Sequence, residues 1–459
     1  MQTPFSFDPI FTFGSLSVFL LVGIVLRARI TFLQRFIIPS CLIGGIVGLI
    51  VINSLPINLD IKLYEAFIYH LFTISFISVG LSAFAKDENE EKKEPGPGAK
   101  TILRGALWGG LMQGVALPSQ AILGCALVMI FGFFGMELFP TFGLFAPLGF
   151  TQGPGQALSF GKVWEGFGFE NAATIGLIFA ALGFAFAFFV GVPMVNWGMK
   201  KIRGSNEKLL LPEEILKGYF PPHIKKESAG HQSTHSSNVD SLAFQSALVG
   251  MVFLMTYGFV TLLNMVMSET LSKLMWGFIF FFGLLIALLL GLVLKKIGLV
   301  FLIDKRLQKR ITGWSIDFLI IATIMAIKPA IVVQYVVPIV IISLLAGIIT
   351  TVIFVFFGKR LDAYNLQRMV LSYGTCTGTL SSGLLLLRMT DPDFDSPVAI
   401  EAGILALTAA PVVVVSMVLV NAKFLFGWEI VHIMLAFSGL LILNLVLLKI
   451  TKLWGGPKF

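Results

Sequence analysis

Long apolar runs alternate with short polar segments along almost the whole chain. Eleven of these runs approach or exceed the roughly 20 residues that a helix needs to cross a bilayer. They lie near 10–26, 36–52, 66–85, 105–134, 172–198, 241–265, 274–294, 313–332, 336–357, 398–424 and 428–448. The pattern predicts an all-α polytopic membrane protein with about eleven spans.

Two further apolar stretches, 138–160 and 364–388, are interrupted by loops rich in glycine and hydroxyl side chains. One loop reads Thr151-Gln152-Gly153-Pro154-Gly155-Gln156, and the other runs from Ser372 to Ser382. Lipid cannot satisfy the N–H and C=O groups of non-helical backbone, so such loops survive at membrane depth only when buried in protein or lining a watery cavity. We interpret each stretch as a re-entrant hairpin with its loop at the tip.

The distribution of basic residues predicts the orientation of the spans. If the spans alternate, 27 of the 33 Lys and Arg residues lie in loops on one side, and Lys62, Lys162 and Lys273 lie in loops on the other. Cytoplasmic loops carry the excess of Lys and Arg. The N-terminus is therefore expected outside and the C-terminus inside.

This orientation predicts an inverted repeat. Five spans precede a polar segment at 199–240, and the next five run in the opposite sense, so the two loops enter the membrane from opposite sides. We expect a first repeat at 1–198, a cytoplasmic linker at 199–240 and a second repeat at 241–424. An extra C-terminal span and tail follow at 425–459.

Composition supports a membrane location and excludes several other classes. The chain is 56% hydrophobic and 13% charged, about half the charged share of a soluble domain. Its net charge of +8 does not indicate nucleic-acid binding, because the basic residues sit in short loops. Three isolated cysteines form neither a disulfide framework nor a metal motif. We expect a multi-pass protein of the cell (inner) membrane without a cofactor or a cleaved signal peptide.

The chemistry of the loops is typical of a site for a small anion with sodium. Glycine lets backbone amides approach a ligand, and helix N-termini attract anionic groups. Hydroxyl and unwound carbonyl oxygens can hold sodium. The substrate-binding candidates are Gln152, Gly153, Gly155, Gln156, Gly374, Thr375, Thr377, Gly378, Thr379 and Arg388. The ion-coupling candidates are Thr151, Ser372, Ser381, Ser382 and Asp317.

Three charged residues in apolar surroundings each have two readings. Arg388 can grip a carboxylate through two parallel hydrogen bonds, or it can belong to the cytoplasmic interface. Asp317 can bind a coupling cation or cap the cytoplasmic start of its helix. Lys328 precedes Pro329, so it marks a helix break or extends to the outer interface.

Motifs of other membrane proteins are absent from the sequence. No GxxxxGK[ST] phosphate loop, HExxH motif or nucleophile elbow occurs, so we expect neither an ATP-driven pump nor an enzyme. An ion channel, or a proton-coupled carrier of a different organic anion, remains the alternative.

Four segments carry a resemblance to a known family. Ile38–Gly45, Ile77–Leu81, Thr151–Phe160 with Gly168–Ala172, and Gly358–Met389 occur in one order along the chain. They resemble elements of the bacterial sodium/glutamate symporter family. At Gln152–Gln156 the chain has Gln where the family commonly has His in a GHGTG-like motif.

The resemblance implies sodium-coupled import of glutamate, or of a related small anionic amino acid or dicarboxylate. It also implies two inverted five-span repeats, each with a re-entrant hairpin, and a homodimer. The family's scaffold domain holds the dimer, and its transport domain moves like an elevator with both hairpin tips.

Overall fold

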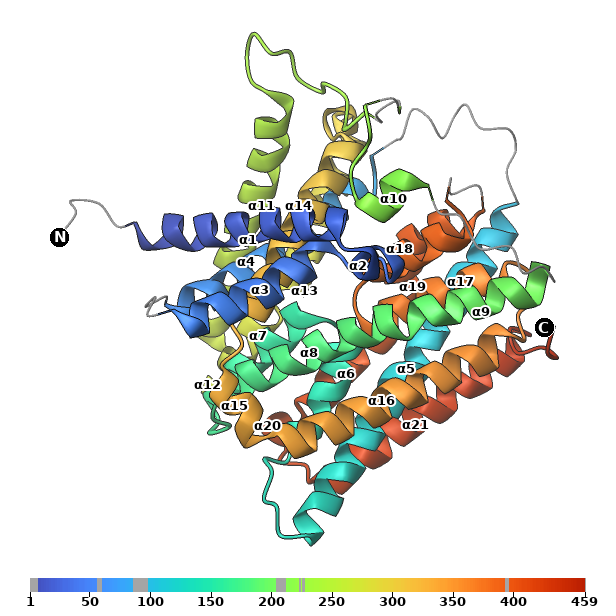
Figure 1. The fold of residues 1–459 in the computed structure, drawn as a ribbon. Helices are drawn as coiled ribbons and strands as arrows, with labels where there is room; N and C mark the ends of the chain where they lie inside the picture. Colours follow the sequence, from blue (N-terminus) through green and yellow to red (C-terminus); the bar gives the residue numbers. More distant parts are fainter. Residues whose placement is uncertain are drawn as a thin grey trace.

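Helices form every regular element in the part of the chain that the computed structural model describes, namely residues 7–55, 60–85, 98–203, 212–222, 224, 228–392 and 396–458 (Figure 1). The first half contains α1 (Asp8–Arg29), α2 (Thr31–Arg35), α3 (Ser40–Ser54), α4 (Ile61–Ser82), α5 (Ala99–Phe133), α6 (Phe145–Phe150), α7 (Pro154–Glu165), α8 (Ala172–Phe189) and α9 (Gly191–Arg203). A 3-10 turn, η2 (Phe142–Leu144), precedes α6.

A short helix, α10 (Glu213–Lys217), separates this half from the second. The second half contains α11 (Ser241–Val266), α12 (Glu269–Gly277), α13 (Ile279–Lys296), η3 (Val300–Leu302), α14 (Lys305–Met325), α15 (Pro329–Gln334), α16 (Val336–Gly358), α17 (Asn365–Thr377), α18 (Leu380–Thr390), α19 (Val398–Val420), α20 (Ala422–Phe426) and α21 (Ile430–Ile450).

Nine helical segments within the described ranges are long and apolar enough to cross a membrane. They are α1, α4, α5, α8 joined to α9, α11, α13, α16, α19 and α21. The other two predicted runs, 36–52 and 313–332, correspond to α3 and α14. Helix α3 has only 15 residues, and α14 begins with the charged sequence Lys305–Arg310.

Side-chain caps and proline explain several helix boundaries. Asp60, Asp240 and Asp304 each accept hydrogen bonds from first-turn backbone amides of α4, α11 and α14, which satisfies donors that a helix start leaves unpaired. Helix α14 ends at Met325, and Lys328 is extended before α15. The structure therefore shows the helix break that the Lys-Pro pair permits.

The helices form two groups (Figure 1). The first group consists of α1, α3, α4, α11, α13 and α14, which pack mainly on one another. The second group consists of α5 to α9, α16 to α19 and α21. Apart from short helices such as α2, α12 and α15, each half of the chain contributes in the same order: three helices to the first group, then a long helix, a broken helix pair and another long helix to the second.

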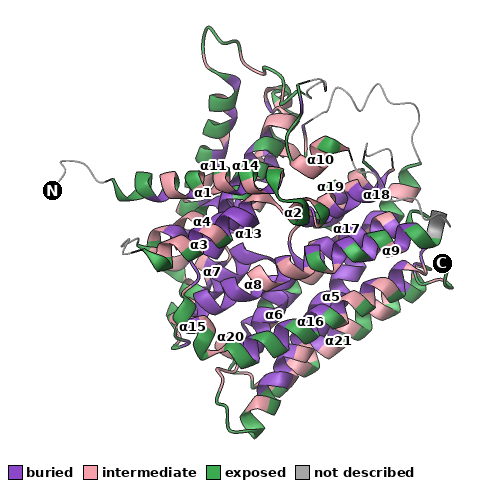
Figure 2. Cartoon of the chain, in the orientation of Figure 1, coloured by how far each residue is buried: buried purple, intermediate pink, exposed green. Residues whose placement is uncertain are grey.

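Burial separates inner from outer helices (Figure 2). The most apolar window of α5 is 72% buried, whereas those of α1 and α21 are each 17% buried. Outer helices with exposed apolar faces are expected where lipid is the solvent. Helix α5 therefore lies at the centre of the second group, where it packs against α16, α19 and α21.

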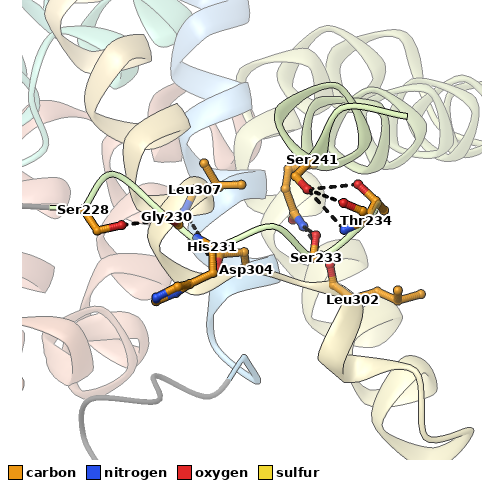
Figure 3. A network of polar contacts seen from close by, with 10 residues as sticks. Ser228, Gly230, His231, Ser233, Thr234, Ser241, Leu302, Asp304 and Leu307 are labelled. Atoms are coloured by element: carbon orange, nitrogen blue, oxygen red, sulfur yellow. Dashed lines mark hydrogen bonds and ion pairs between the residues drawn. The ribbon is translucent and has the colours of Figure 1, made fainter. Parts of the chain in front are cut away.

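The described parts of the predicted linker are attached to the first group. The His231 backbone amide donates to Asp304 Oδ2 at 3.1 Å, and Gln245 Nε2 donates to Ser233 Oγ at 3.0 Å and to the Leu302 carbonyl at 2.7 Å (Figure 3). Arg27 donates to the Ile215 carbonyl of α10 at 2.8 Å. Residues 204–211, 223 and 225–227 of the linker lie outside the described residues.

Candidate functional site

The two glycine loops predicted from the sequence meet in space. The first tip, residues 151–156, spans the break between α6 and α7, and the second tip, residues 374–382, spans the break between α17 and α18. A Cβ placed on Gly153 would lie 3.3 Å from the Gly378 carbonyl oxygen and 3.5 Å from Thr379 Cγ2. Segments far apart in the sequence thus form one site between the two broken helix pairs.

The backbone of the first tip requires its glycine. Gly153 has φ +83°, in the left-handed region that side chains with a Cβ rarely adopt. Helix α7 starts at the next residue, Pro154, a position where the missing N–H of proline costs nothing. Helix α18 starts directly after Thr379. The N-termini of two helices, with their unpaired amides, therefore lie at the tips.

A buried polar network joins both tips to the centre of the second group. Gln120 of α5 accepts from Thr151 Oγ1 at 2.7 Å, and its Nε2 donates to Thr350 Oγ1 of α16 at 2.9 Å. The same Nε2 lies 3.3 Å from the Cys376 carbonyl oxygen, and Thr151 Oγ1 lies 3.2 Å from that oxygen. Gln120 is fully buried. One amide therefore holds both hairpins in register.

Several buried polar atoms at the tips have no hydrogen-bond partner among the described residues. They are Gln152 Nε2, Gln156 Oε1, Thr379 Oγ1 and, from α19, Ser416 Oγ. Gln152, Gln156 and Ser416 line one cavity of about 10 Å³, which is the size of a single water molecule. Buried polar atoms are nearly always paired in proteins, so this cluster indicates a place where a ligand or an ion satisfies them.

Several second-tip residues already have structural partners. The hydroxyls of Thr375 and Thr377 donate to carbonyls one turn back in α17, at 2.8 Å each. A Cβ on Gly374 would lie 2.7 Å from Gly383 Cα, so these glycines let α17 and α18 cross closely. A Cβ on Gly378 would lie 2.8 Å from Ser382 Oγ.

Two further ion-coupling candidates, Ser372 and Ser381, lie in α17 and α18, the helices of the second tip. Ser372 is buried in α17, facing α5, since a Cβ on Gly109 would lie 3.5 Å from its Oγ. Ser381 is half-buried in the first turn of α18.

Two predicted site residues lie away from the tips. Arg388 is half-buried in the last turn of α18, at the base of the second hairpin. Asp317 is in α14 of the first group, where it interacts with Cys41 of α3. The structure therefore gathers the loop residues but does not bring these two charged side chains to them.

The base of the second hairpin carries a buried ion pair. Arg368 of α17 and Glu401 of α19 have side chains that are 5% and 3% exposed. Arg368 Nε donates to Glu401 Oε2 at 2.8 Å, and Arg368 Nη2 donates to the Thr101 carbonyl of α5 at 3.0 Å. This pair fixes the hairpin to two neighbouring helices and explains how both charges are tolerated inside the protein.

Comparison with known families identifies the group to which this arrangement belongs. The family model of the sodium/glutamate symporter matches residues 5–383, more than four-fifths of the chain. The chain belongs to the sodium/glutamate symporter family. Membership implies sodium-coupled glutamate transport by a membrane transporter rather than an enzyme. None of the curated proteins matches the chain.

The region matched to the symporter family contains both tips, and it ends before α19 and α21. Gln120 and Thr350 are not among the residues predicted from the sequence, although a polar residue inside a membrane-length apolar run is itself a signal of function. Ser416 is likewise a polar residue inside a long apolar run, that of α19. Nothing in the sequence pattern distinguishes Phe72, whose ring covers Gly155: a Cβ there would fall 2.1 Å from Phe72 Cγ.

Proposed function

We propose that this symporter-family protein imports glutamate, or a related small anionic amino acid or dicarboxylate, through a site between the two hairpin tips. The observation that carries the proposal is the contact between the tips, surrounded by buried polar atoms that have no hydrogen-bond partner among the described residues. In a family of sodium-coupled carriers, such a place suits a substrate whose polar groups complete those hydrogen bonds.

Both tips contribute to the substrate site in this proposal. Gln152, Gln156 and Thr379 supply side-chain groups to the substrate, while Gly153, Gly155 and Gly378 allow close approach of backbone amides. Gly374, Thr375 and Thr377 shape the second tip. Oxygens of Thr151, Ser372, Ser381 and Ser382 are the proposed sodium ligands. Arg388 and Asp317 would reach the substrate site only if their helices moved.

We further propose an elevator mechanism with inverted repeats. The first helix group would be the scaffold and form a homodimer, and the second group would be the transport domain that carries both tips. Support comes from the packing: contacts are dense within each group and sparse between them, where they involve mainly α7 and α8. The shared order of the main helices in the two halves supports the repeat.

Transport by purified protein in lipid vesicles tests the function. An inward sodium gradient should drive accumulation of labelled glutamate above its external concentration. Gly378→Val should abolish uptake, because a Cβ there meets Ser382 and Phe184 at 2.8 and 3.1 Å. Gly403→Val in α19, where a Cβ meets nothing within 4 Å, is the matched control.

The same vesicles separate the alternatives. Uptake driven by a proton gradient and indifferent to sodium would favour a proton-coupled carrier. Ohmic single-channel currents without accumulation would show a channel and overturn the proposal.

A further inference from the structure

A crevice of about 540 Å³ opens between α4 and α12 on one side and α7 of the first hairpin on the other. Its volume falls in the usual range for small-ligand sites. Three of its lining residues are Lys62, Lys162 and Lys273. These are the three lysines that the charge distribution assigns to outer loops, and they come from three separate segments of the chain.

The three lysines differ in how firmly they are paired. Lys162 Nζ lies 2.7 Å from Glu65 Oε2 and 3.0 Å from Glu165 Oε2, so two carboxylates hold it. Lys273 Nζ lies 2.8 Å from Glu269, whose side chain is 84% exposed. Exposed pairs of this kind contribute little free energy, so Lys273 can exchange its partner for a ligand.

Lys62 is the third cation of the crevice. No carboxylate in the described part of the chain forms an ion pair with it, since Asp60 accepts only its backbone amide. Glu65, the acidic residue of the lining, is 7% exposed and already engaged with Lys162. The lining therefore presents available positive charge and no available negative charge.

The inner end of the crevice adjoins the first tip. Leu158 and Ser159 of α7 line it, one turn beyond Gly155. On α4, Tyr69 lines it one turn before Phe72, and the Phe72 ring covers Gly155. Phe72 lies 4.9 Å, centroid to centroid, from Phe280 of α13. An aromatic contact thus lies between an open cationic crevice and the proposed substrate site.

We propose that this crevice is an outer loading site, where the anionic substrate binds through Lys62 and Lys273 before Phe72 moves aside and admits it to the tips. The inference rests on the proposed function and extends it. A cleft with positive charge and apolar walls raises the local concentration of anions and their association rate. Its chemistry fits the carboxylate of a dicarboxylate or of an anionic amino acid.

Kinetics of glutamate uptake test the role of the two lysines. In the double variant Lys62→Gln/Lys273→Gln, KM should rise about tenfold while kcat stays near the wild-type value, because capture weakens and the tips are unchanged. At fixed sodium, added choline chloride should raise the wild-type KM more than that of the variant, since salt screens the attraction. Lys328→Gln, outside the crevice, should leave KM unchanged.

Thiol labelling locates the bound anion directly. The native cysteines Cys41, Cys125 and Cys376 are buried, so a membrane-impermeant thiol reagent should report on introduced positions. Ala66→Cys, in the crevice wall, should be labelled from outside and protected by glutamate. Ser268→Cys, exposed at the start of α12, should be labelled equally with and without glutamate.

The lipid composition of the vesicles separates a free anion from a lipid headgroup. If anionic phospholipid protects Ala66→Cys and glutamate does not, the crevice binds headgroups and the proposal is wrong. An unchanged KM in the double variant, alongside sodium-driven uptake by the wild type, would overturn the loading site and leave the proposed function intact. Absence of wild-type uptake would overturn both.

Discussion

Gln120 illustrates how one buried side chain can serve several elements. An amide offers both an acceptor and donors, and Gln120 uses its oxygen for Thr151 of the first tip and its nitrogen for Thr350 of α16. Its nitrogen also approaches the Cys376 carbonyl of the second tip. The side chain is therefore a shared support for both hairpins rather than a filler of helix α5.

Replacing this amide should destabilise the protein and stop transport. Gln120→Leu removes the acceptor of Thr151 Oγ1 and the donor to Thr350 Oγ1, so that Thr151 and the Cys376 carbonyl keep only each other. Losing these buried hydrogen bonds should cost about 1–3 kcal/mol. We expect a lower thermal unfolding midpoint in detergent and loss of sodium-driven uptake. Gln113 lies in the same helix but makes no hydrogen bond within the described residues. Gln113→Leu should therefore change the unfolding midpoint and the uptake much less. Equal effects at the two positions would refute a special role for Gln120.

Gly155 offers a second test at the scale of single residues. In Gly155→Ala the new Cβ would fall 2.1 Å from Phe72 Cγ, so the tip or the ring must shift. Since small misplacements at functional sites are costly, uptake should drop at least about tenfold.

The double variant Gly155→Ala/Phe72→Ala should recover part of the uptake, because it removes the clash. A double-mutant cycle in vesicles measures this coupling. Gly439→Ala, where a Cβ meets nothing within 4 Å, is the control. If uptake by the double variant is no better than uptake by Gly155→Ala, then Gly155 matters because of its contact with the ligand and not because of its contact with Phe72.

Among the elements, the second hairpin depends on the ion pair at its base. Arg368→Gln leaves the buried Glu401 carboxylate without its partner, a change that typically costs about 3–5 kcal/mol. Thermal unfolding should therefore occur at a clearly lower temperature. The double variant Arg368→Met/Glu401→Met removes both charges and should be more stable than either single variant.

An exposed ion pair provides the comparison for this prediction. Arg104 lies 3.9 Å from Asp362, with side chains 44% and 66% exposed. Arg104→Gln should change the free energy of unfolding by less than about 1 kcal/mol. If it destabilises the protein as much as Arg368→Gln, burial is not what makes the Arg368–Glu401 pair matter.

The sequence located breaks in the helices where a physical rule applied to local sequence, whereas the bounds of the repeats and of the re-entrant hairpins stay predictions. Loops rich in glycine and hydroxyl side chains cannot face lipid, and both loops interrupt helices near the expected positions. The stretch 138–160 corresponds to η2, α6 and α7, which ends at Glu165, and the stretch 364–388 corresponds to α17 and α18. Long-range partners were not predictable. Glu401 pairs with Arg368 only because α19 packs against α17, and no local pattern encodes that contact.

At the scale of the whole molecule, charge and hydropathy predicted a polytopic helical membrane protein, and the structure and the family match agree. The inverted repeat and the orientation stay predictions. The division into two groups was not visible in the sequence, because it depends on which helix faces meet. Apolar spans show almost no polar stripe to reveal those faces, since lipid and protein interior demand similar residues.

A crosslink between the two groups tests whether they move as separate bodies. Glu65 of α4 and Lys162 of α7 form an ion pair across the boundary. In the variant Glu65→Cys/Lys162→Cys, a short bifunctional thiol reagent should abolish uptake, and a cleavable linker should restore it on reduction, because an elevator needs the groups to slide. Arg104→Cys/Asp362→Cys joins positions within the second group and should transport equally with and without the reagent. Full crosslinking at 65 and 162 with uptake preserved would mean that transport needs no movement between α4 and α7.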